Sequence, residues 1–122
     1  MSTESYISLK FMHMNGSSPG ESRPITAPEL NAFLTSEKAK LSSELADFLR
    51  SVEIALIRFP CFRDEQHGIE HVFAIARLGK DLLIFDDAED EFGLGEPGED
   101  GVLRNWVLCG DLIDALRIVR SR

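Results

Sequence analysis

The sequence predicts an α+β fold in which an antiparallel sheet of about four strands is covered on one face by a long N-terminal helix and a short C-terminal helix. Apolar side chains recur at steps of three and four residues between positions 30 and 52, which is typical of a helix. After residue 54 they fall into short continuous runs, which are typical of strands. From residue 112 the helical spacing returns. An antiparallel sheet with both helices on one face accommodates this order best.

The first 24 residues are expected to form an arm and a flexible linker ahead of a single α+β domain over residues 25–122. Apolar and polar side chains alternate within residues 6–14, as they do in a short strand. Residues 15–24 are rich in Gly, Ser and Pro, which indicates a linker.

The long helix is predicted to begin at Thr26, because Thr26 and Glu29 have the spacing of a capping box. The stripe of apolar side chains lapses at residues 35–40. Either a kink divides two helices there, with Ser36 capping the second, or one helix extends beyond the core. We expect the stripe to pack into the core. A dimer face is the alternative, so the chain is predicted to be a monomer or a homodimer.

Three buried strands are predicted at residues 54–57, 72–76 and 82–85. The last two are separated by Gly79 and Lys80, and glycine at the first turn position is typical of a type II′ hairpin.

Residues 102–108 are predicted to form a fourth strand, which contains Trp106. Asp111 is expected to cap a final helix. The inward face of that helix is predicted to consist of Leu112, Leu116 and Val119.

Residues 81–100 contain nine of the 21 acidic residues and no Lys or Arg. The remaining 12 acidic and 13 basic residues nearly cancel, so the acidity is local. A passive connection of this length is unusual. Either residues 91–95 form a further strand, or the segment is a functional loop.

Composition excludes several classes of function. A net charge of −8 and an isoelectric point near 4.8 oppose binding to nucleic-acid phosphates. The longest apolar run is five residues, against about 20 for a membrane-spanning helix. No signal for export is recognised near the start, so we expect a cytoplasmic protein that binds neither nucleic acid nor membrane.

Recognisable catalytic signatures are missing, so we predict no catalytic residue and no cofactor. The sequence therefore favours a protein that is not an enzyme. The chain has no nucleophile elbow, no phosphate-binding loop and no signature around either cysteine. His67 and His71 are four residues apart, but Gly68 and the turn-like surroundings weaken a metal pair. The acidic run fits no register of a calcium loop. No metal ligands are therefore predicted, although weak divalent-ion binding stays open.

The acidic run favours recognition of a basic protein, because its carboxylates can steer a partner and nearby aromatic side chains can anchor it. We therefore predict a non-enzymatic protein-binding domain. The alternative functional prediction is a small-molecule or divalent-metal binding domain with hydrolytic activity, and a third interpretation is that the carboxylates only maintain solubility. The predicted partner-binding residues are Asp86, Asp87, Glu89, Asp90, Glu91, Phe92 and Trp106.

Residues 86–116 carry a loose motif formed by Asp90-Glu91-Phe92-Gly93, Gly101, Trp106, Gly110-Asp111-Leu112 and Ala115-Leu116. In this quarter of the chain the sequence resembles the C-terminal part of small bacterial proteins of unknown function, some of which are similar to immunity proteins found beside secreted toxins. The resemblance implies a bacterial, cytosolic, single-domain protein whose partner is a toxin domain. It implies no particular contact residue.

Overall fold

The structure is a computed structural model that describes residues 24–121. Contacts between residues divide the chain into two compact units, Met1–Lys40 and Leu41–Arg122. The strand predicted at residues 6–14 and the predicted linker, apart from Pro24, lie outside the described residues. The predicted N-terminal arm therefore stays a prediction.

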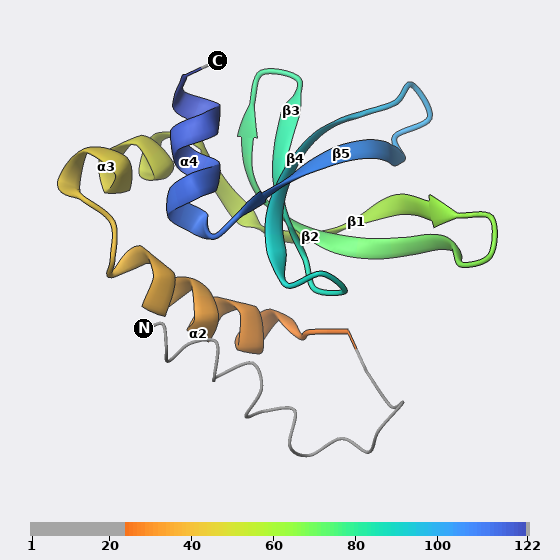
Figure 1. The fold of residues 1–122 in the computed structure, drawn as a ribbon, viewed down its shortest axis with the longest axis horizontal. Helices are drawn as coiled ribbons and strands as arrows, with labels where there is room; N and C mark the ends of the chain where they lie inside the picture. The colour runs from red at the N-terminus through yellow and green to blue at the C-terminus, as the bar shows by residue number, and fades with distance from the viewer. Residues whose placement is uncertain (1–23, 122) are drawn as a thin grey trace. The chain divides into compact units, whose positions relative to one another are not determined.

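In the first unit, helix α2 (Ala27–Lys38) begins at the predicted capping box (Figure 1). The Thr26 hydroxyl accepts a hydrogen bond from the backbone N–H of Glu29 at 3.3 Å, and the Glu29 carboxylate accepts one from the N–H of Thr26 at 3.0 Å. The capping box is confirmed. Glu37 occupies a buried position on this helix, and its carboxylate is neutralised by the ammonium group of Lys40 at 2.9 Å.

The second unit begins with helix α3 (Ser43–Val52), so the predicted long helix is in fact two helices. The Ser42 hydroxyl accepts a hydrogen bond from the N–H of Leu45 at 3.2 Å and thereby caps α3. Of the two alternatives, the break is present, but the capping residue is Ser42 rather than Ser36. Leu45 and Leu49 are the buried residues of α3.

The predicted open sheet is wrong, because five strands close into a barrel. Neighbouring strands pair antiparallel from the first to the fifth, and the fifth then pairs parallel with the first. Direction alternates at each step, so strands one and five point the same way and their closing pair must be parallel. The strands are β1 (Glu53–Asp64), β2 (Gly68–Leu78), β3 (Asp81–Asp86), β4 (Glu91–Pro97) and β5 (Leu103–Gly110).

The strand that the four-strand prediction lacks is β4, whose sequence is poor in the β-branched residues that usually mark strands. Gly93 and Gly95 are required there because β4 and β5 approach closely. A Cβ atom at Gly95 would lie 2.7 Å from the carbonyl oxygen of Asn105 and 2.9 Å from the Cβ of Trp106. Of the two interpretations of residues 91–95, the strand is confirmed.

Closure also removes the need for the predicted helical cover, because a barrel buries the inner face of its own sheet. Four of the five strands contribute side chains to one apolar cluster of the core. The cluster consists of Cys61, Val72, Ala74, Leu82, Ile84 and Leu103, with Ile54, Phe59 and Trp106 packed against it. Among residues 24–121, a long helix across one face of a sheet is not observed.

The other local predictions are confirmed, except that the strand predicted as buried at residues 54–57 lies in β1 but is not buried, since Ile57 is 53% exposed. Gly79 has a φ of 62° in the two-residue turn between β2 and β3, where Leu78 pairs with Asp81. Asp111 caps the final helix α4 (Leu112–Arg120) by accepting a hydrogen bond from the N–H of Asp114 at 2.9 Å. Helix α4 contacts α3, β4 and β5 (Figure 1). No helix in residues 24–121 is long and apolar enough to cross a membrane.

Candidate functional site

The seam between β1 and β5 closes the barrel with little backbone pairing. Within the described residues, their parallel register consists of one pair, Cys61 opposite Leu103. Side chains from both strands therefore have to complete the closure.

Arg63 of β1 and Asp86 at the end of β3 form the central contact near this seam. The Arg63 Nη1 and Nη2 atoms donate to Asp86 Oδ2 and Oδ1 at 2.9 and 3.0 Å, and Arg63 Nε donates to Glu70 Oε1 at 3.1 Å. Asp86 is 0% exposed. Burial raises the pKa of its carboxyl group, but the hydrogen bonds and charge of Arg63, together with hydrogen bonds from Trp106 and Ala88, hold that pKa below its usual value.

Trp106 of β5 joins the same network. Its indole Nε1 donates to Asp86 Oδ2 at 3.2 Å, and the Arg63 guanidinium lies 5.3 Å from the centre of its ring. A second cation–π contact crosses the seam between Arg104 and Phe62, at 5.6 Å. Asp86 and Trp106, both predicted to bind a partner, are thus brought together by contacts within the barrel.

Phe92 is 1% exposed and packs against Phe85, with ring centres 5.1 Å apart in an edge-to-face arrangement. It is therefore part of the interior of the fold rather than of its surface.

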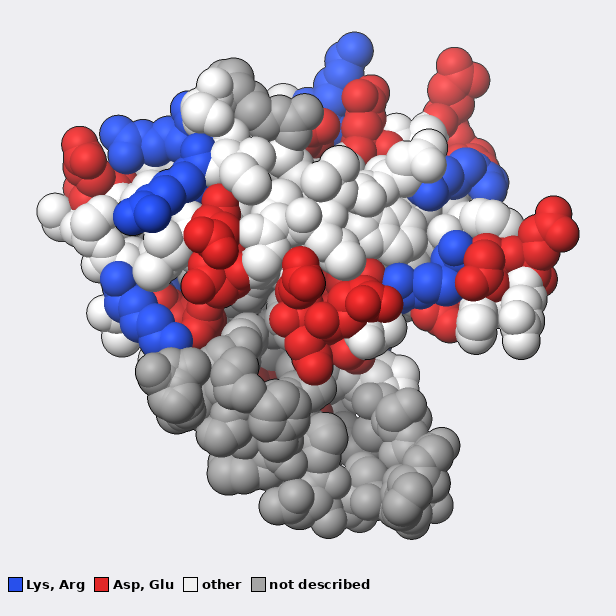
Figure 2. Space-filling model, in the orientation of Figure 1, with Lys and Arg blue, Asp and Glu red and all other residues white. Residues whose placement is uncertain are grey.

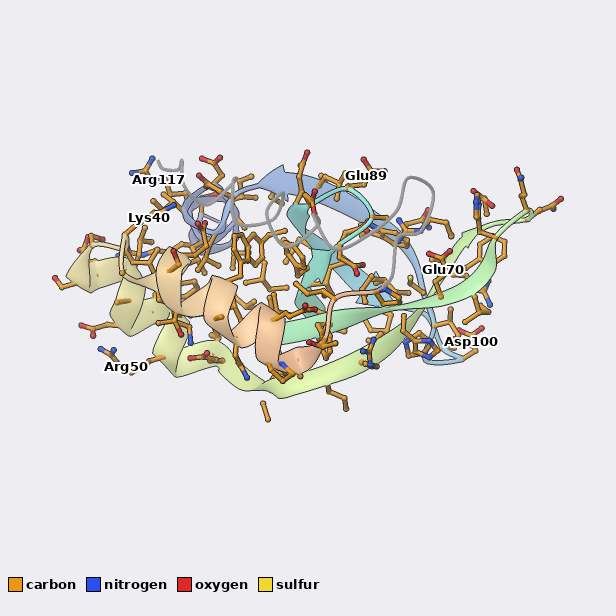
Figure 3. The ribbon with its side chains drawn as sticks, turned by 90° about the horizontal axis from the view of Figure 1, so that it is seen from below. Lys40, Arg50, Glu70, Glu89, Asp100 and Arg117 are labelled. Atoms are coloured by element: carbon orange, nitrogen blue, oxygen red, sulfur yellow. The ribbon has the colours of Figure 1, made fainter. Side chains whose placement is uncertain are left out.

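The other predicted partner-binding residues lie at the turn between β3 and β4. Residues 87–90 form the turn, and Asp90 adopts a φ of 59°. Glu89 is exposed, whereas Asp87, Asp90 and Glu91 are half-buried. Figure 3 places Glu89 at this turn, well apart from Asp100 at the β4–β5 turn.

The start of α4 adjoins this turn, because the Glu91 carboxylate accepts a hydrogen bond from the backbone N–H of Gly110 at 3.2 Å. Asp111 and Asp114, both exposed, follow immediately. Figure 2 shows acidic side chains over the turn and over the start of α4 on the same side of the barrel. We name this surface the acidic face, and it consists of Asp87, Glu89, Asp90, Glu91, Asp111 and Asp114.

The carboxylates at the start of α4 repel one another. Burial raises the pKa of Asp114, and the negative charge of Asp111 raises it further. The folded protein therefore holds these charges together against their mutual repulsion.

The rest of the predicted acidic segment lies elsewhere. Asp81 is at the opposite end of β3 from the acidic turn. Glu96 is five positions after Glu91 in β4, which corresponds to about 17 Å along an extended strand. Asp100 forms an ion pair with Arg104 at 2.5 Å, so part of its charge is balanced locally. The sequence segment is thus divided between two ends of the barrel.

Metal ligands do not converge within residues 24–121, where no group of three or more His, Cys, Asp or Glu side chains is arranged to hold an ion. His67 contacts Asp64 through Nδ1 at 2.8 Å. The alternative prediction of divalent-metal or small-molecule binding with hydrolysis stays a prediction, and calorimetric titration with calcium, magnesium, manganese and zinc tests its metal component.

Sequence reasoning missed two members of the acidic face, Asp111 and Asp114, because it assigned Asp111 only a capping role and Asp114 none. It also missed Arg63, which is a single arginine in a polar segment. A local signal for the first two exists, since two carboxylates three residues apart lie on one face of a helix. None exists for Arg63, whose partner Asp86 is 23 residues away.

Comparison of the chain with protein-family models, with curated proteins and with solved structures returned no match.

Proposed function

We propose that residues 41–121 form a non-enzymatic protein-binding domain whose acidic face receives a basic surface of a partner protein. The observation that carries the proposal is the hydrogen bond between Glu91 and Gly110, which joins two acidic segments into one surface. Neither segment, 87–91 nor 110–115, contains Lys or Arg.

The energetic argument is that repulsion among these charges opposes folding, whereas a basic partner would relieve it. Burial is the first cause of the raised pKa of Asp114 and the negative charge of Asp111 is the second, so at least these two carboxylates repel each other. Complementary charge accelerates encounter and fixes orientation more than it increases affinity. We therefore expect a complex that forms rapidly and weakens as salt rises.

The resemblance of residues 86–116 to immunity-like bacterial proteins supports a toxin domain as the partner. In this proposal the partner is a toxin domain with a basic surface, and the complex forms in the bacterial cytoplasm. A nuclease is one such toxin, because its active site binds phosphates and is therefore basic.

The test is coexpression with the product of the neighbouring gene, followed by capture of the complex at increasing salt. An acidic-face variant carries Glu89→Gln, Asp111→Asn and Asp114→Asn, which removes three exposed charges while Asn keeps the helix cap. A control carries Glu65→Gln, Glu96→Gln and Glu99→Gln, which removes three exposed charges from other turns and strand ends.

The acidic-face variant should release the partner at clearly lower salt than the wild type, and the control should behave almost as the wild type does. Equal behaviour of the two variants would contradict a role for the acidic face.

A further inference from the structure

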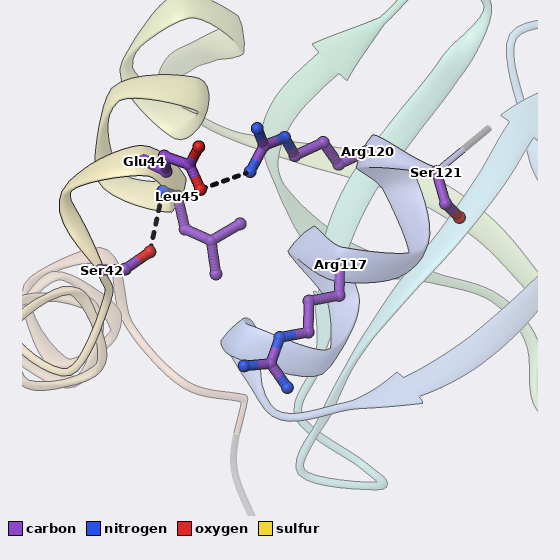
Figure 4. A pocket seen from close by; sticks show the side chains of 6 residues that line it. All are labelled: Ser42, Glu44, Leu45, Arg117, Arg120 and Ser121. Carbon is purple, nitrogen blue, oxygen red and sulfur yellow. Dashed lines mark hydrogen bonds and ion pairs between the residues drawn. The ribbon is translucent and has the colours of Figure 1, made fainter.

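Helices α3 and α4 border a cavity of about 340 Å³ on the second unit (Figure 4). Its lining residues, Ser42, Glu44, Leu45, Arg117, Arg120 and Ser121, come from the start of α3 and the end of α4. None of them belongs to the acidic face. We call it the α3–α4 cavity.

Positive charge exceeds negative charge among the lining residues, because they include two arginines and one glutamate. Arg120 Nη1 lies 3.6 Å from Glu44 Oε1, and these side chains are 44% and 75% exposed. An ion pair this long and this exposed is weak. The guanidinium of Arg117 forms no hydrogen bond with the described residues, although its charge also acts on Asp114 one turn earlier.

The hydroxyl groups of the lining add one further donor. Ser42 accepts a hydrogen bond from the N–H of Leu45 and retains its own O–H for donation. Ser121 already donates its O–H to the carbonyl oxygen of Ile118 at 2.8 Å. The lining therefore contains two guanidinium groups and one hydroxyl that can donate, and of these Arg120 lies beside Glu44 (Figure 4).

We propose that the α3–α4 cavity binds an oxyanion, a carboxylate or a phosphate group, that replaces the Glu44 carboxylate on Arg120. A planar guanidinium fork matches the two oxygens of either group. Glu44 is then a built-in competitor whose exposed side chain can turn away into solvent.

A second cavity, of about 380 Å³, shares Arg120 with the first, and in this proposal it receives an apolar part of the ligand. Arg120 lines both cavities, and the second is otherwise lined mainly by apolar side chains. They are Phe48, Leu78, Leu94 and Val119, with Asp81 as the acidic member. The oxyanion can thus belong to free phosphate or to an organic acid with an alkyl tail, and the two sources are separated by experiment.

Affinity for a small anion is expected in the millimolar range, because the protein carries a net charge of −8 and both arginines are exposed. This inference does not rest on the proposed function, since it uses other residues and a ligand of opposite charge.

The experiment titrates the full chain with inorganic phosphate and, separately, with hexanoate, at constant ionic strength, and follows the amide signals of Ser42 and Ser121 by NMR. Arg120→Gln should weaken binding by about tenfold or more, the effect of losing hydrogen bonds to a charged group. Glu44→Gln should strengthen it by about two- to fivefold, because the competing carboxylate is gone. The matched control is Arg50→Gln, which removes an exposed arginine of α3 that does not line the cavity.

If only phosphate binds, the cavity is a simple anion site. If hexanoate binds, with or without phosphate, the cavity is a site for an organic acid. Either result supports the proposal. Three results overturn it: neither probe binds, Arg50→Gln weakens binding as much as Arg120→Gln, or Glu44→Gln weakens binding. Urea unfolding of each variant establishes that the fold is retained.

Discussion

The Arg63 guanidinium donates two hydrogen bonds to the buried carboxylate of Asp86, and this pair supports the seam where β1 and β5 close the barrel with one register pair. Each partner also forms hydrogen bonds outside the pair. Trp106 and Ala88 donate to Asp86, and Glu70 accepts from Arg63. Its contribution can be measured by removing one partner at a time.

Arg63→Met should lower the free energy of unfolding by about 3–5 kcal/mol, because it leaves the buried Asp86 carboxylate without its ion pair. Asp86→Leu should lower it by less, because Arg63 keeps its ion pair with Glu70. The double variant should lose less than the sum of the two single losses. A double-mutant cycle from urea unfolding at pH 7 measures this difference. Simple additivity of the two losses would contradict a coupled pair.

Acid should weaken the barrel through the same pair. The pKa of Asp86 is lowered in the folded state, so its contribution is fully present above the unfolded value near 3.9 and is lost as pH falls through the folded value. The free energy of unfolding should therefore fall more steeply below pH 4 in the wild type than in Asp86→Asn. Parallel acid profiles for the two proteins would count against this assignment.

Asp114→Asn should raise stability at neutral pH. The pKa of Asp114 is raised by burial and by Asp111, so its ionised form disfavours folding above that pKa. Because Asp114 is exposed, the expected gain is only about 0.2–0.5 kcal/mol. Chemical unfolding at pH 7 measures it, and a loss of stability would show that the charge is favourable. If the acidic face binds a basic partner, the same variant should also bind that partner more weakly.

Gly95→Ala should destabilise the protein by about 1–3 kcal/mol, since a Cβ atom there would overlap the backbone of Asn105. Gly98→Ala is the matched control, because its nearest contact is the flexible side chain of Asp100 at 3.3 Å. Thermal unfolding compares the two. Equal melting temperatures would show that β4 and β5 can separate without cost.

Local features of the fold could be predicted because their causes are local. The capping box at Thr26 and the hairpin at Gly79 depend on residues within three or four positions of each other. Closure of the barrel depends instead on pairs such as Cys61 with Leu103, which are 42 residues apart and leave no periodic signal. Strand β4 was not among the four predicted strands because it contains glycines, which have low strand propensity. Those glycines are present because β5 packs closely against β4.

The candidate site could be predicted only in part for the same reason. Asp86 and Glu89 look alike in an acidic run, yet one is 0% exposed and paired with Arg63 whereas the other is exposed. Only the fold separates them. It also brings Asp111 beside the β3–β4 turn through the contact of Glu91 with Gly110.

The measurement that tests the acidic face most directly is NMR mapping of the complex with the captured partner. Amide signals of residues 87–91 and 110–114 should shift on binding, and those of residues 98–102 at the other end of β4 should stay in place. Shifts confined to residues 98–102, with the acidic face unperturbed, would contradict the proposed function.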